Sequence, residues 1–124
     1  MPRTHTFLVA CMAAALAPCA RADVTLPHVF GSHMVLQRDQ AIPVWGWADA
    51  GEEVAVKLGD LPVATATADA TGAWRVDLPA QPAGGPLTLT VTGANTLTLD
   101  DILIGDVWLC SGQSNMEWTV NGCT

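Results

Sequence analysis

The stretch WRVDLPAQPAGGPLTLTVT, residues 74–92, contains two segments in which apolar and polar residues alternate, at residues 74–78 and 87–92. Because successive side chains of a strand point to opposite faces, this alternation predicts two β-strands that each bury one face. Residues 79–86 between them contain three prolines and two glycines, which predicts a loop.

Similar short segments lie on both sides of this stretch, at a spacing of roughly ten residues. No helical period interrupts them before residue 110. We therefore predict a mainly β fold, an antiparallel β-sandwich of the jelly-roll or immunoglobulin-like type, over residues 23–99. The tryptophans suit the core of such a sandwich, and the alternative is that Trp45 or Trp47 lies on the surface and stacks on a sugar ring. The further predicted strands are residues 24–26, 34–36, 42–47, 54–58, 65–69 and 96–99.

Residues 1–22 have the pattern of a secretory signal peptide. A weakly basic start precedes an unbroken apolar run over residues 7–17, and Ala20-Arg21-Ala22 supplies small residues before the cleavage point. The run is shorter than the roughly 20 apolar residues of a membrane-spanning helix. A buried N-terminal helix is the alternative, and Pro18 argues against a lipoprotein signal that ends at Cys19. The sequence therefore predicts export, to the periplasm or the medium.

The charge of the chain excludes two classes of partner. The 124 residues carry a formal net charge of −7, and the predicted mature chain keeps three basic and all twelve acidic residues. Nucleic acids and anionic membrane surfaces bind basic protein surfaces. We therefore expect no nucleic acid as a partner, and no membrane association after the signal is cleaved.

Two cysteines remain after the predicted cleavage, Cys110 and Cys123. Export permits a disulfide between them. The alternatives are a pairing of Cys110 with a cysteine outside these residues and a buried, reduced Cys110. The spacing of the cysteines, with His28 and His33 far upstream, does not predict a metal site, and we expect no cofactor.

The sequence pattern changes at Asp100. Ile102-Leu103-Ile104 and Val107-Trp108-Leu109-Cys110 are continuous apolar runs, typical of a strand that is buried on both faces in a parallel sheet. The polar tract SGQSNMEW, residues 111–118, follows directly. A serine at the carboxyl end of such a strand has the position of an esterase nucleophile, with backbone N–H groups near its oxygen. Residues 100–124 are therefore predicted to begin an α/β domain.

The same tract has a purely structural interpretation. Ser114-Asn115-Met116-Glu117 fits the S-x-x-E capping box, which begins helices in many proteins. The tract also departs from the G-x-S-x-G nucleophile motif, because Met116 stands at the place of the second glycine. Spacing alone leaves both interpretations open.

Two longer blocks resemble a known family. Residues 105–118, GDVWLCSGQSNMEW, resemble the first conserved block of the sialate O-acetylesterases, within the SGNH (GDSL-like) hydrolases. Residues 26–38, LPHVFGSHMVLQR, resemble the N-terminal segment of the same family, and PVWGW at residues 43–47, followed by Gly51-Glu52, continues the match. The resemblance covers essentially the whole mature chain.

This resemblance implies an N-terminal β-sandwich followed by an SGNH α/β hydrolase domain, of which residues 100–124 would form only the first strand and turn. It implies a serine esterase that removes acetyl groups from sialic acids or from other acetylated glycans, including xylan. Ser114 matches the nucleophile, and its backbone N–H matches one oxyanion-hole donor. The block around the nucleophile is matched by Gly112, Gln113, Asn115 and Met116.

The family's Asp-x-x-His pair and its remaining oxyanion-hole donors have no counterpart among the 124 residues. His28 and His33 match the sandwich segment, and nothing in the sequence places Asp100, Asp101 or Asp106 on a histidine. We therefore expect the front part of a secreted esterase, inactive by itself. The alternative is an exported, non-catalytic β-sandwich that binds carbohydrate.

Overall fold

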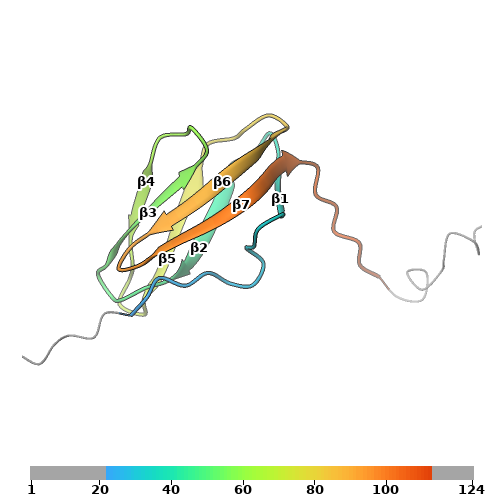
Figure 1. Cartoon of the computed structure of the whole chain (residues 1–124). Coiled ribbons are helices and arrows are strands. Elements are labelled where there is room, and N and C mark those ends of the chain that lie inside the picture. Colours follow the sequence, from blue (N-terminus) through green and yellow to red (C-terminus); the bar gives the residue numbers. More distant parts are fainter. Residues whose placement is uncertain (1–21, 113–124) are drawn as a thin grey trace, which may run out of the picture.

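The computed structural model describes residues 22–112, which form seven β-strands and, within that range, no helix. The predicted mainly β fold is confirmed. In Figure 1, β2 and β5 form one layer and β6 and β7 cross in front of them. The strands are β1 (Val35–Gln37), β2 (Ile42–Trp47), β3 (Glu53–Leu58), β4 (Ala64–Thr67), β5 (Ala73–Leu78), β6 (Gly84–Thr92) and β7 (Thr96–Gly105).

The strands form a five-stranded sheet, in the order β1-β7-β6-β3-β4, and a two-stranded sheet of β2 and β5. The pairs β2–β5, β3–β4, β3–β6 and β6–β7 are antiparallel, as the sequence predicted. β1 departs from the prediction, because it pairs in parallel with the end of β7. A parallel partner needs a long connection, and here most of the domain lies between the two strands.

One core lies between the two sheets, and the alternation of the sequence places residues in it. In β5, Trp74, Val76 and Leu78 are buried, while the intervening Arg75 and Asp77 are exposed. In the facing sheet, Leu58, Leu89 and Val91 are completely buried in the same cluster. Burial of one apolar face of each sheet is the dominant stabilising contribution to such a fold.

The end of β7 corrects two of the predictions. Ile102 is completely buried and Ile104 nearly so, but Leu103 is 43% exposed, so this segment is not buried on both faces. Leu103 lies on the outer face, against Gly85, where any side chain on the glycine would meet it. Because β7 continues to Gly105, the sandwich extends beyond the boundary predicted at residue 99.

The described tryptophans divide between core and surface, which corrects the expectation that they all suit the core. Trp74 is 4% exposed and belongs to the core cluster. Trp45 and Trp47 are 38% and 49% exposed on the outer face of β2, and Trp108 is 85% exposed. Trp45 and Trp47 therefore lie on the surface, as the alternative required, and their stacking on a sugar ring remains a prediction.

Gly51 and Glu52, which belong to the family resemblance, have structural roles. Gly51 has a φ of 79°, a left-handed conformation that glycine adopts without steric cost. Glu52 is buried, and its carboxylate accepts hydrogen bonds from the backbone N–H groups of Asp49, at 3.1 Å, and Ala94. One carboxylate thus ties the turn before β3 to the turn between β6 and β7.

Asp69 organises the turn that precedes β5. Its Oδ1 accepts hydrogen bonds from the hydroxyl of Thr71 at 2.6 Å, the N–H of Thr71 at 2.7 Å and the N–H of Ala73 at 3.1 Å. The bond from the Thr71 hydroxyl, followed by that from its N–H, lowers the pKa of Asp69 below its usual 3.8. The folded protein therefore favours the ionised form of this carboxyl.

We predict that Asp69→Asn makes stability less dependent on pH under acid conditions. The folded pKa lies below the unfolded one, so Asp69 stabilises the fold above the unfolded pKa and loses that contribution as pH falls through the folded pKa. Urea midpoints measured across the pH range from about 6 to about 2 should fall less steeply for Asp69→Asn than for the unsubstituted protein. Thr71→Ala should give an intermediate slope, because the backbone donors remain. Parallel curves for Asp69→Asn and the unsubstituted protein would contradict the prediction.

Candidate functional site

Two blocks of the sequence that resemble the family lie side by side at one edge of the larger sheet. β1 pairs with the end of β7 in a register that sets Val35 beside Leu103 and Gln37 beside Gly105. The end of the block at residues 26–38 and the start of the block at 105–118 therefore meet where the chain leaves the sandwich.

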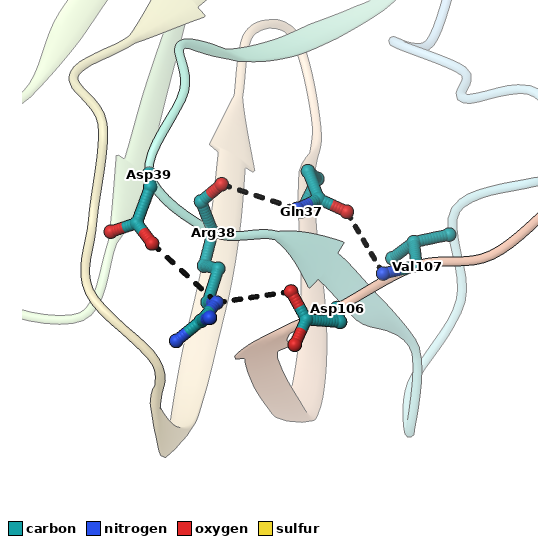
Figure 2. A network of polar contacts seen from close by, with 5 residues as sticks. All are labelled: Gln37, Arg38, Asp39, Asp106 and Val107. Atoms are coloured by element: carbon teal, nitrogen blue, oxygen red, sulfur yellow. Dashed lines mark hydrogen bonds and ion pairs between the residues drawn. The ribbon is translucent and has the colours of Figure 1, made fainter.

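Five residues form the polar contacts at this point, which we call the exit network: Gln37, Arg38, Asp39, Asp106 and Val107 (Figure 2). Nε of Arg38 donates to Oδ1 of Asp106 at 3.0 Å, and it lies 3.5 Å from Oδ2 of Asp39. The N–H of Val107 donates to Oε1 of Gln37 at 2.8 Å. Figure 2 shows these side chains reaching from the end of β1 to the segment that follows β7.

The exit network fixes the direction of the chain more than it stabilises the fold. Arg38 and Asp106 are 44% and 55% exposed, and an ion pair of that kind contributes at most about 1 kcal/mol. Two hydrogen bonds add a geometric constraint: the N–H of Arg38 donates to the C=O of Gly105 at 2.9 Å, and the N–H of Val107 donates to the side chain of Gln37. The chain is thus held on both sides of Asp106, shortly before the serine tract begins at residue 111.

The described part of the chain reaches only the start of the predicted nucleophile block. Gly112 is exposed and lies outside the strands. Gln113, Ser114, Asn115 and Met116 lie outside the described residues, so the nucleophile remains a prediction.

Cys110 is exposed, which corrects the alternative that it is buried and reduced. Cys123 lies outside the described residues, so its pairing with Cys110 remains a prediction.

Residues 107–110 do not form the buried strand predicted for them. Val107, Trp108 and Leu109 are 52%, 85% and 93% exposed, and they follow the end of β7 without strand pairing. A continuous apolar run predicts burial but does not supply the neighbouring strands and helices that would bury it. Among residues 22–112, nothing covers these side chains.

His33 and Asp101 form a pair that the sequence did not predict. Nδ1 of His33 lies 2.7 Å from Oδ2 of Asp101, and both residues have positive φ, at 68° and 57°. A carboxylate on Nδ1 is the arrangement that orients a catalytic histidine. Both groups are exposed, however. From Asp101, β7 continues for on the order of 15 Å before the chain leaves the sandwich at Asp106, so the pair lies well before the exit network. His28 is also exposed.

A groove of about 560 Å³ lies next to the exit network, and we call it the exit groove. Its walls come from the segment before β1, from β1, from the outer face of the β2–β5 sheet and from Val107. Trp45 lines it, with the ring of Phe30 edge-on at a centroid distance of 4.8 Å. Arg75 and Asp77 provide charged groups on the wall, and they bond to each other at 2.8 Å.

Residues 22–112 contain no group of three histidine, cysteine or acidic side chains that could hold a metal ion. In the same range there is no helix long and apolar enough to span a membrane.

Comparison with known proteins gives a consistent result, although no family model matches the chain. The sialate O-acetylesterase of Rattus norvegicus is 39% identical over 101 residues, which cover 72% of this chain and 18% of the relative. The human sialate O-acetylesterase is 39% identical over 98 residues, which cover 70% of this chain and 19% of the relative.

A solved structure agrees with these sequence matches. The crystal structure of a carbohydrate acetylesterase from Xanthomonas citri is 52% identical, with a TM-score of 0.72, and the match covers 77% of this chain and 22% of that one. This chain therefore spans about a fifth of the length of its relatives. The identities, together with the two blocks that meet at the exit network, show that the chain belongs to the sialate O-acetylesterase family.

Proposed function

We propose that this chain supplies the β-sandwich and the nucleophile of a serine esterase that removes O-acetyl groups from carbohydrates. The supporting observation is the meeting of residues 26–38 with residues 105–107 at the exit network, directly before the serine tract. The relatives that share this part of the chain are named sialate O-acetylesterase and carbohydrate acetylesterase. We accordingly propose O-acetylated sialic acids or other acetylated glycans as substrates.

The proposed reaction is a two-step acyl transfer. The Ser114 hydroxyl attacks the acetyl carbonyl while a histidine removes its proton, and the sugar hydroxyl leaves with that proton. The backbone N–H of Ser114 donates to the oxyanion of the tetrahedral intermediate. Water then attacks the acetyl-serine, releases acetate and restores the serine. The net reaction consumes one water and needs no cofactor.

We propose that the 124 residues do not carry out this reaction unaided. A serine hydroxyl is a weak nucleophile without a neighbouring base, and no Asp-x-x-His sequence is present in the chain. The His33–Asp101 pair lies well before the point where the chain leaves the sandwich, and both groups face solvent. The histidine would therefore come from polypeptide beyond these residues. Residues 1–22 are proposed to direct export.

A hybrid enzyme tests the proposed function. Residues 23–124 replace the corresponding stretch of the Xanthomonas citri acetylesterase, which is 52% identical to this chain, and acetate release from acetylated xylan and acetylated sialic acid is measured. We expect the hybrid to release acetate, while residues 23–124 alone release none above buffer. A folded hybrid without activity on any acetyl ester would argue against the proposal.

A further inference from the structure

The exit groove places an exposed indole beside a pair of charged side chains. Trp45 is exposed on the outer face of β2, and its opposite neighbour across the β2–β5 pair is Arg75. Asp77 lies two residues further along β5, on the same face. Directly opposite residues of an antiparallel pair have neighbouring side chains, so the indole and the charged pair adjoin on one surface. All three residues line the groove.

The indole of Trp45 is supported from one side. The ring of Phe30 meets it edge-on, with the ring centroids 4.8 Å apart and an angle of 74° between the ring planes. Phe30 itself packs against the core cluster. Trp45 therefore presents an apolar face that is already ordered, which lowers the entropy cost of binding a ligand there.

The charged pair uses only part of its hydrogen-bonding capacity. Nε and Nη2 of Arg75 both donate to Oδ1 of Asp77, at 3.1 and 2.8 Å. Within residues 22–112, neither Oδ2 of Asp77 nor Nη1 of Arg75 has a further hydrogen-bond partner, and both side chains are exposed. The pair thus offers one acceptor and one donor next to the indole, while its two charges cancel.

This combination matches a neutral sugar. A sugar hydroxyl both donates and accepts, so neighbouring hydroxyls can bond to Oδ2 of Asp77 and to Nη1 of Arg75. The C–H face of a pyranose ring is apolar and can stack on the indole of Trp45. The groove, at about 560 Å³, has the size of a small-ligand site with mostly apolar walls and a few polar groups.

Other classes of ligand match the groove less well. An apolar or proline-rich peptide segment would remove water from the charged pair without replacing its hydrogen bonds, because it carries no hydroxyl and proline has no N–H. An anionic ligand would meet no net positive charge, since Asp77 neutralises Arg75.

We propose that the exit groove binds a neutral glycan chain, with one sugar ring stacked on Trp45 and its hydroxyls bonded to Arg75 and Asp77. Such a site anchors the sandwich on a polysaccharide. The inference goes beyond the proposed function and does not depend on it, because it rests on described residues of the sandwich and requires no ester chemistry.

NMR titration with unacetylated hexasaccharides of xylose, glucose and mannose tests the site in the predicted mature chain, residues 23–124. These probes carry no ester, so the result is independent of acetate release. We expect at least one of them to cause saturable shifts at the indole N–H of Trp45 and at the methyl groups of Met34 and Val35, which line the groove. Val63, which is exposed outside the groove, should not shift. No shift with any of the three, or equal shifts at Val35 and Val63, overturns the proposal.

Matched tryptophan variants connect the binding to the groove. Trp45→Ala should raise the Kd of the bound hexasaccharide by about 10-fold or more, and Trp45→Phe, which keeps an aromatic face, by less. Trp47→Ala lies on the same face of β2 but outside the groove, and it should leave the Kd unchanged. Equal losses for Trp45→Ala and Trp47→Ala overturn the proposal.

Asp77→Ala tests the polar half of the site, and it keeps the test valid if Trp45→Ala unfolds, because the Asp77 side chain is exposed. We expect it to weaken binding of the neutral hexasaccharide. We also expect it to allow binding of an oligogalacturonate of the same length, which carries a carboxylate on each ring, because Arg75 then has no partner. Unchanged affinity for both chains overturns the proposal.

Two other occupants give different results, and each overturns the proposal. If the rest of the enzyme covers the groove, the fluorine signal of a fluorotryptophan at Trp45 stays fixed when the hexasaccharide is added to the hybrid esterase. If the groove takes a proline-rich segment, a decaproline peptide shifts the groove signals and displaces the hexasaccharide.

Discussion

Ser114→Ala lowers the rate of acetate release by the hybrid esterase by a factor of roughly 10⁴ to 10⁶, with little change in KM. The reason is that alanine cannot form the acetyl intermediate, while the residues that bind the sugar remain. The remaining activity comes from direct attack of water on the acetyl carbonyl, whose oxyanion the oxyanion-hole donors still stabilise. The measurement is acetate release under saturating substrate, and mass spectrometry of the quenched enzyme detects the acetyl group on the serine.

Ser111→Ala is the matched control, because this serine stands three residues earlier in the same polar tract. It is exposed and outside the strands, and the resemblance assigns it no chemistry. We expect a change of less than about 10-fold, which corresponds to 1.4 kcal/mol of barrier. Equal losses for Ser111→Ala and Ser114→Ala would mean that the tract is needed for folding, and retention of activity in Ser114→Ala would exclude it as the nucleophile.

Ile102→Ala destabilises the sandwich by about 2–5 kcal/mol, a large share of the roughly 5–15 kcal/mol that holds a domain of this size folded. Ile102 is completely buried in the core cluster, opposite Leu87 in the β6–β7 pair. Removing three carbon atoms there leaves a cavity between two sheets that cannot close fully around it. Thermal unfolding followed by circular dichroism should show a midpoint lower by about 10–25 °C.

Leu103→Ala is the control in the next position, where the side chain points to the outer face and is 43% exposed. We expect it to cost about 1 kcal/mol or less, since half of its surface is already in contact with water. If Ile102→Ala and Leu103→Ala cost the same, residues 102–104 do not belong to the core of the sandwich, and the boundary at residue 99 would stand.

The alternating segments were predictable because each needs only local information. In residues 74–78 and 87–92, the apolar residues predict which face of each strand is buried. The structure confirms this at five positions, Trp74, Val76, Leu78, Leu89 and Val91. Successive side chains of a strand point to opposite faces, so apolar and polar residues alternate in the sequence wherever one face of the strand is buried. The mainly β class followed from the same signal.

The apolar run at residues 102–104 was misinterpreted because two different environments give the same pattern. Leu103 looks like a second buried face, but it packs over Gly85, which has no side chain of its own, and remains partly exposed. The sequence does not reveal which apolar side chains on the outer face of the sheet will lie over a glycine of the neighbouring strand and so stay partly exposed. Only the β6–β7 register supplies that information.

The site beyond the sandwich core depends on contacts that no local pattern encodes. His33 and Asp101 are 68 residues apart, and they meet because both adopt positive φ next to a bond from His33 N–H to Asp100 C=O. Likewise, Arg38 belongs to one family block and Asp106 to the other, and the resemblance gave the blocks without their pairing. Bringing them together requires the parallel register of β1 and β7, a consequence of the whole topology.

The parallel pairing of β1 with β7 also sets the order of events during synthesis. β1 leaves the ribosome early, but its partner residues, Leu103 to Gly105, are made only after the other strands. Closure of such a long loop is slow, and it comes after the hairpins that need only neighbouring residues. The nascent sandwich therefore stays open at one edge until the exit segment itself has been synthesised.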